Sequence, residues 1–101
     1  MQVDIRIDQL AQEGQVRQLL AYRVGELENW VARLSIDIAG IVDARGSDGY
    51  DCRLIARLTD GATLDVYERQ ASLDLALVRA LDRSVRTCRR RLRRSRPAYA
   101  I

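Results

Sequence analysis

The sequence predicts an α+β domain in which one β-sheet carries two helices on the same face. Two patterns support this: apolar residues alternate with polar ones in four short segments, and they recur every three or four residues in two longer ones. The resulting order along the chain is β-α-β-β-β-α. Each helix has one apolar stripe to bury, so both stripes are expected to pack against one face of a single sheet.

Four segments have the alternation of half-buried strands, beginning with residues 1–8, where apolar side chains occupy the odd positions. The other three are residues 36–45, 51–59 and 63–67. The turn signal Gly46-Ser47-Asp48-Gly49 separates the second strand from the third, and Asp60-Gly61 separates the third from the fourth. The last three strands are therefore expected to form two consecutive hairpins.

Two segments have the period of amphipathic helices. The first covers residues 14–34. The second is expected to begin after Ser72, a favourable N-cap, and to run to about Arg94, before Pro97. A chain of 101 residues accommodates one core, which predicts a single domain over residues 1–96 and a short tail over residues 97–101. The arrangement is similar to that of double-stranded-RNA-binding domains.

Charge is distributed very unevenly along the chain. All 17 basic residues are arginine, and the net charge is +3. Residues 1–78 hold eight arginines against thirteen acidic residues, whereas residues 79–101 hold nine arginines and a single acid, Asp82. The sequence therefore predicts an acidic body with a basic C-terminal helix.

Few residues suited to catalysis are present. The chain has no histidine, which removes the commonest general base and metal ligand. Cys52 and Cys88 fall on the inward faces of a strand and a helix, where inert core thiols are expected. The acidic loop of residues 43–51 does not fit an EF-hand, because Arg45 and Asp48 stand where that loop needs a ligand and a glycine. We therefore expect a protein that is not an enzyme, with no cofactor, no metal and no small-molecule substrate.

No signal-peptide pattern opens the sequence, and no apolar run approaches the roughly 20 residues of a membrane helix. Two cysteines are too few for a disulfide framework. We therefore expect a cytoplasmic protein that does not associate with membranes.

The arginines of the last helix form one stripe opposite its apolar residues, at about 100° per residue. The stripe consists of Arg79, Arg83, Arg86, Arg90, Arg93 and Arg94. A solvated helix face usually mixes both signs of charge, because like charges one turn apart repel. This stripe indicates an anionic partner, and the arginine fork matches phosphate oxygens. With few aromatic residues to stack on bases, contact with folded RNA is favoured; the alternative is a protein-interaction module that docks the basic helix on an acidic protein.

Several short stretches, together with the element order, resemble one known family, the ribosome hibernation promoting factors. This family is also called ribosome-associated inhibitor A or the sigma-54 modulation proteins. The stretches are Asp51-Cys52-Arg53, Ala56-Arg57-Leu58, Gln70-Ala71-Ser72-Leu73, Ala76-Leu77, and Asp82-Arg83 followed by Arg86 and Arg90. The chain resembles the short form of the family, which lacks a second, dimer-forming domain.

The resemblance implies a stress-response protein that binds rRNA of the small ribosomal subunit in the channel used by mRNA and tRNA, and so inhibits translation. It implies RNA contacts by Arg79, Arg83, Arg86 and Arg90 on the last helix and by Arg23 on the first. Glu26 and Glu28 make the first helix more acidic than in typical members, so the last helix is expected to contribute most of the binding. Away from the ribosome, a monomer is expected.

Overall fold

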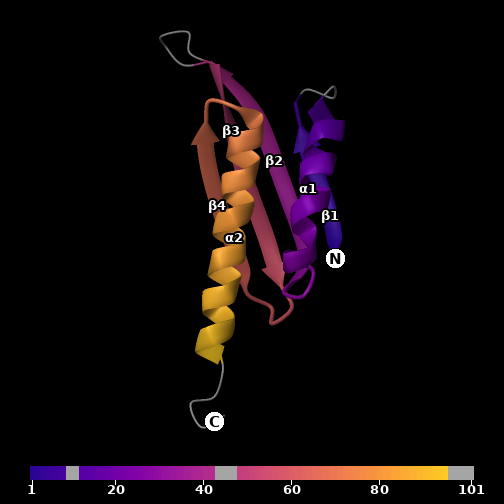
Figure 1. Ribbon diagram of the computed structural model, residues 1–101, viewed down its shortest axis with the longest axis vertical. Helices are drawn as coiled ribbons and strands as arrows, with labels where there is room; N and C mark the ends of the chain where they lie inside the picture. The colour runs from indigo at the N-terminus through magenta and orange to yellow at the C-terminus, as the bar shows by residue number, and fades with distance from the viewer. Residues whose placement is uncertain (9–11, 43–47, 96–101) are drawn as a thin grey trace.

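The computed structural model describes residues 1–8, 12–42 and 48–95, and for residues 24, 42 and 92–95 it describes the backbone alone. Its elements follow the predicted β-α-β-β-β-α order (Figure 1). They are β1 (Gln2–Ile7), α1 (Glu13–Leu27), β2 (Val31–Val42), β3 (Asp48–Leu58), β4 (Thr63–Gln70) and α2 (Leu73–Ser95). The predicted boundary after residue 96 and the tail beyond it lie outside the described residues.

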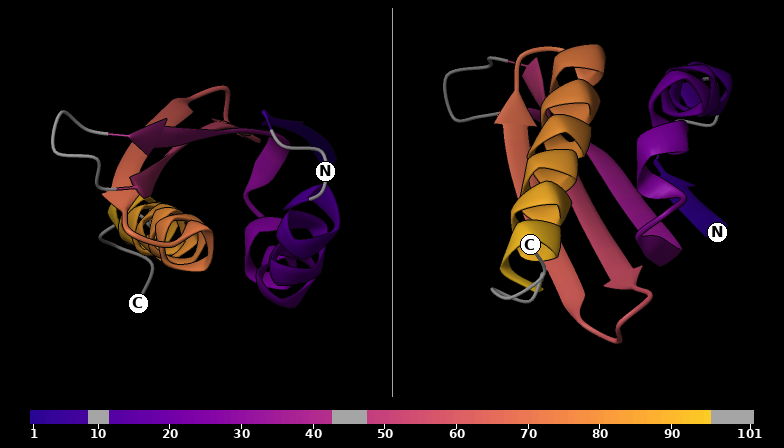
Figure 2. Two further views of the ribbon diagram at one scale, coloured as in Figure 1. Left: turned by 90° about the horizontal axis from the view of Figure 1, so that it is seen from above. Right: turned by 60° about the horizontal axis from the view of Figure 1, so that its bottom comes forward.

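The four strands form one mixed sheet in the order β1-β2-β3-β4. β1 pairs with β2 in parallel, and β2-β3 and β3-β4 are antiparallel. The parallel pair requires a crossover connection, which α1 supplies. Figure 2 shows both helices on the same side of the curved sheet, as the sequence predicts.

The hydrophobic core lies between the two helices and this face of the sheet. Alternation along β3 places Cys52, Leu54, Ala56 and Leu58 inward, and all four are buried. From α2, the predicted apolar stripe contributes several of the most deeply buried side chains. These are Leu77, Leu81 and Cys88, with Val85 packed at the margin.

The first helix ends earlier than the predicted residue 34, because its apolar period continues into a strand. α1 stops at Leu27, where the Trp30 amide donates to the Leu27 carbonyl at 3.0 Å, and β2 begins at Val31. A bulge between Val31 and Arg33 shifts the register against β3. Because of this bulge, Val31 and Leu34 both turn into the core although they are three residues apart. That spacing in the sequence is the same as one turn of a helix.

The β3–β4 turn and the start of α2 agree with the prediction. Gly61 has a positive φ of 91°, a conformation that favours glycine, and the Ala62 amide donates to the Asp60 side chain at 2.9 Å. Ser72 caps α2 by accepting a hydrogen bond from the Leu75 amide at 3.2 Å. β4 extends three residues past the predicted end, because its backbone remains paired with β3 as far as Gln70. α2 packs on β3 and β4 and against α1.

Candidate nucleic-acid interface

The outward face of α2 carries a row of four arginines, Arg79, Arg83, Arg86 and Arg90, all exposed. Their spacing of three or four residues places them one above another along the helix, because residues so spaced share a face. Among the described side chains of this helix, those that face the core are apolar apart from Ser84, whose hydroxyl donates to the Ala80 carbonyl at 2.8 Å. The fold therefore fixes the arginine row toward solvent by burying the opposite side of the helix.

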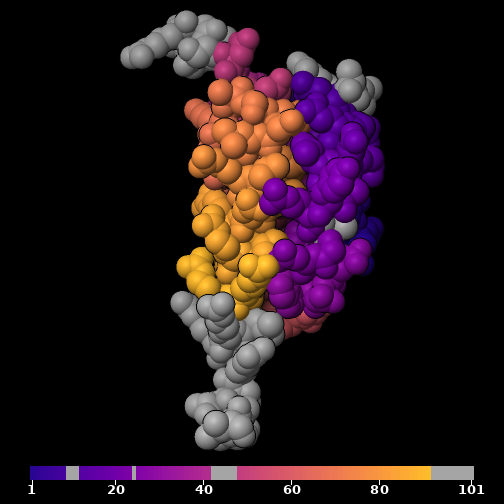
Figure 3. Space-filling model, viewed as in Figure 1, coloured from indigo at the N-terminus to yellow at the C-terminus, as the bar shows by residue number. Residues whose placement is uncertain are grey.

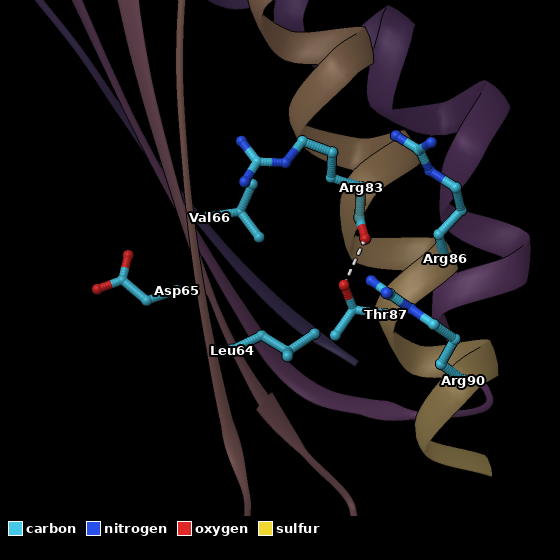
Figure 4. A pocket seen from close by; sticks show the side chains of 7 residues that line it. All are labelled: Leu64, Asp65, Val66, Arg83, Arg86, Thr87 and Arg90. Carbon is cyan, nitrogen blue, oxygen red and sulfur yellow. Dashed lines mark hydrogen bonds between the residues drawn. The ribbon is translucent and has the colours of Figure 1, made fainter. Parts of the chain in front are cut away.

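The lower part of this row borders a groove between α2 and β4, with a volume of about 510 Å³ (Figure 4). Arg83, Arg86 and Arg90 come from the helix, and Leu64 and Val66 of β4 form an apolar floor. Asp65 also borders the groove, but its carboxylate points away from the helix (Figure 4) and accepts a 2.7 Å hydrogen bond from Arg53. The groove thus presents guanidinium groups beside an apolar floor.

The upper part of the row borders a second hollow of about 540 Å³ on the outward face of α2. Arg79 lines it, and Arg83 and Arg86 line both hollows. Two carboxylates, Glu68 and Asp82, also lie at its border. The structure therefore brings all four predicted arginines of the row to one continuous surface.

Arg83 differs from its neighbours because it also contacts β4. Its guanidinium donates to the Tyr67 carbonyl at 2.7 Å and lies 3.7 Å from the Glu68 carboxylate. Tyr67 belongs to an edge strand, whose outward carbonyls have no strand partner. Arg83 consequently ties α2 to the edge of the sheet.

The other three arginines of the row form no ion pair with any described residue. Arg79, Arg86 and Arg90 are exposed and spaced over three turns of α2. By contrast, Arg83 pairs with Glu68, Arg89 with Glu26, and Arg91 with Asp60 at 2.9 Å. The positive charge of α2 that no described carboxylate offsets is therefore concentrated on its outward face.

The seam where α1 meets α2 carries polar pairs that cross between the helices. Figure 3 shows the two helices lying side by side along this seam. Arg23 of α1 pairs with Asp82 of α2, and Glu26 of α1 pairs with Arg89 of α2. The predicted RNA-binding residue Arg23 thus lies outside the row but beside it, paired with a carboxylate of the other helix.

On the uncovered face of the sheet, arginines alternate with aspartates and pair with them. Arg33 pairs with Asp4 at 2.8 Å, Arg53 with Asp65 at 2.7 Å, and Arg69 with Asp51 at 2.7 Å. Tyr67 adds a 2.7 Å hydrogen bond to Asp51. This face therefore resembles an ordinary solvated surface, in contrast to the outward face of α2.

These pairs predict a loss of stability in acid. The hydrogen bonds from Arg69 hold the pKa of Asp51 below its usual value, and those from Arg53 do the same for the pKa of Asp65. A carboxyl group whose pKa is lower in the folded chain stabilises the fold at a pH above its unfolded-state pKa of about 4. This stabilisation disappears as the pH falls through the folded-state pKa. We expect the urea concentration at the unfolding midpoint to decrease when the pH is lowered from 5 to 2.5, and to decrease less in the D51N/D65N variant. Equal falls in both proteins would show that these carboxylates are not responsible.

Both cysteines are buried, as the sequence predicts. Cys52 is fully enclosed and Cys88 is 3% exposed. Burial raises the pKa of Cys52 to about 12 and also raises the pKa of Cys88. The arrangement favours inert thiols.

We expect the native protein to resist alkylation at both cysteines. At pH 8, a thiol with a pKa of about 12 is ionised in roughly one molecule in ten thousand, and the thiolate is the reactive form. Mass spectrometry after iodoacetamide treatment should find little label in the native chain and two labels in 8 M urea. Rapid native labelling of Cys52 would contradict the buried position.

Two further predicted RNA-binding residues, Arg93 and Arg94, lie in the last turns of α2, but their side chains are outside the described part of the structure. Neither described helix contains an apolar stretch long enough to cross a membrane. Residues 1–8, 12–42 and 48–95 contain no cluster of three or more side chains suited to hold a metal ion.

Sequence analysis did not identify Glu68, Asp82 and Glu26 as partners of arginines, since pairs this distant in the sequence leave no local signal.

Comparison with known proteins gives matches in structure alone. No protein-family model matches the sequence, and no curated protein matches it. The N-terminal domain of protein Y from Thermus thermophilus aligns with 89% of this chain and 98% of its own, with a TM-score of 0.64 and 19% identity. A ribosomal subunit interface protein from Coxiella burnetii aligns with 90% of this chain and 97% of its own, with a TM-score of 0.70 and 7% identity. The chain therefore has the same fold as these two proteins.

Proposed function

We propose that this protein is a ribosome-associated translation inhibitor, a hibernation factor that binds small-subunit rRNA through the outward face of α2. The observation that carries the proposal is that three arginines of the row, Arg79, Arg86 and Arg90, form no ion pair with any described carboxylate. An uncompensated row of like charges destabilises the free protein slightly, so its presence favours an anionic partner. One of the two proteins with the same fold is named as a ribosomal subunit interface protein, which favours the ribosome as that partner.

The spacing of the arginines suits a polyphosphate chain better than a single anion. Arg79 and Arg90 are eleven residues apart, so their Cα atoms are separated by about 16 Å along the helix at 1.5 Å per residue. A guanidinium group can bind a phosphate oxygen pair through two hydrogen bonds. Such a row can follow several phosphates of a folded RNA backbone, and these contacts recognise shape rather than sequence.

Inhibition follows from the place of binding in this proposal. A domain that lies on rRNA in the channel used by mRNA and tRNA excludes both from the subunit. No chemistry is required of the protein, which acts by occupancy in the cytoplasm as a monomer. The rate of translation should then depend on the fraction of subunits that carry the protein.

The test is binding to purified small subunits, measured by sedimentation through a sucrose gradient. We expect the protein to move with the subunits at low salt and to be displaced when mRNA and tRNA are bound first. Addition of the protein to a cell-free translation reaction should lower reporter synthesis in proportion to occupancy. Protein that stays at the top of the gradient contradicts the proposal and favours the alternative, an acidic protein partner.

A further inference from the structure

The two solvent-facing sides of α2 differ in the number of their arginines and in how those arginines are paired. On the outward side, Arg79, Arg86 and Arg90 have no carboxylate partner among the described residues. Along the seam with α1, the cross-helix pairs Arg23–Asp82 and Arg89–Glu26 are each neutral, and Asp82 also borders the hollow beside Arg79. At about 100° per residue, Asp82 and Arg89 lie roughly 80° around the helix from the centre of the row. The seam is therefore immediately beside the row.

α1 itself supplies no free positive charge. Its two arginines are both paired, Arg17 with Glu13 at 3.1 Å and Arg23 with Asp82. Glu26 is directed to Arg89, and the exposed Glu28 follows the helix. An RNA strand approaching α1 would meet a surface that is neutral or weakly acidic.

A paired arginine contributes little to RNA binding for a physical reason. The affinity of a basic surface for RNA comes largely from counterions that phosphates release when arginines replace them. An arginine that already has a carboxylate beside it must lose that partner first, and the carboxylate that remains repels the phosphate. An exposed ion pair contributes little to the stability of the fold. Its main effect is therefore on the binding of RNA.

We propose that Glu26 and Asp82 confine RNA to one side of the protein, the outward face of α2 with its groove against β4. This inference rests on the proposed function and specifies the surface used. The two carboxylates act as specificity-determining residues, because they keep Arg23 and Arg89 from extending the RNA-binding surface across the seam to α1. Removal of both carboxylates should widen that surface.

The test is the double variant Glu26→Gln/Asp82→Asn, which frees two arginines beside the row without adding any. If each freed arginine contacts a phosphate, counterion release at about 0.1 M salt contributes roughly fivefold per contact. We expect small-subunit affinity to rise at least fivefold and hydroxyl-radical protection of rRNA to extend over more nucleotides. Circular dichroism checks that the variant folds, and Glu26→Gln alone serves as a milder version.

The matched control is Asp4→Asn/Asp51→Asn on the uncovered sheet face. It makes the same change in net charge and frees Arg33 and Arg69, and neither replaced carboxylate borders the groove or the second hollow. We expect its affinity to stay within twofold of the wild type. Equal gains in both variants would show a general charge effect and overturn the inference, as would an unchanged affinity in E26Q/D82N. Failure of the wild type to bind subunits would instead refute the proposed function itself.

Discussion

Replacing Arg79, Arg86 and Arg90 together with glutamine is expected to lower small-subunit affinity roughly 100-fold at 0.1 M salt. Each phosphate contact contributes about 0.7 to 0.9 to the slope of log affinity against log salt concentration. When the salt concentration is lowered from 1 M to 0.1 M, three contacts therefore raise the affinity by a factor of about 100. Glutamine is a good helix former, and none of the three side chains pairs with a described carboxylate. Affinity is measured by filter binding or by sedimentation with purified subunits.

The control for this experiment changes the same amount of charge elsewhere. Arg6, Arg33 and Arg57 lie exposed on the uncovered face of the sheet. Their replacement with glutamine should lower affinity far less, because long-range attraction between exposed charges is screened beyond about 10 Å. A folded α2 variant that binds subunits as well as the wild type would mean that the row is merely a solvated face.

Replacing Leu77 with alanine is expected to destabilise the protein by about 2–5 kcal/mol, a large share of the roughly 5–15 kcal/mol typical of a domain. Leu77 is fully buried where α2 meets the sheet, and truncation leaves a cavity that close-packed neighbours fill only partly. The free energy of unfolding is measured by urea denaturation followed by circular dichroism.

Leu75, two residues earlier in the same helix, provides the comparison. It is 40% exposed, so its replacement with alanine should change the free energy of unfolding by no more than about 0.5 kcal/mol. Similar losses at Leu75 and Leu77 would be inconsistent with the way α2 packs on the sheet.

The fold was predictable where a single periodicity governs a segment. The alternation in β3 and the apolar stripe of α2 both reappear as buried faces. The end of α1 was not predictable, because the β2 bulge places Val31 and Leu34 inward at a spacing of three, which a helix also has. Bulges depend on pairing with β3, so the sequence of β2 alone does not reveal this one.

The composition of the candidate site was predictable, but its electrostatic environment was not. The helical period alone places Arg79, Arg83, Arg86 and Arg90 on one face. Which arginines meet a carboxylate depends on contacts between distant segments, such as Arg89 with Glu26, 63 residues away. The difference between the neutral seam and the largely unpaired outward row of this basic helix therefore arises only when the chain folds.

The most direct test of the account is the salt dependence of binding to the small subunit. If Arg79, Arg86 and Arg90 each meet one phosphate, log affinity should fall with log salt at a slope between about −2 and −3, at 0.7 to 0.9 per contact. The triple glutamine variant should then show a slope close to zero. A wild-type slope near zero, or a triple variant with the wild-type slope, would contradict binding of rRNA by the outward face of α2.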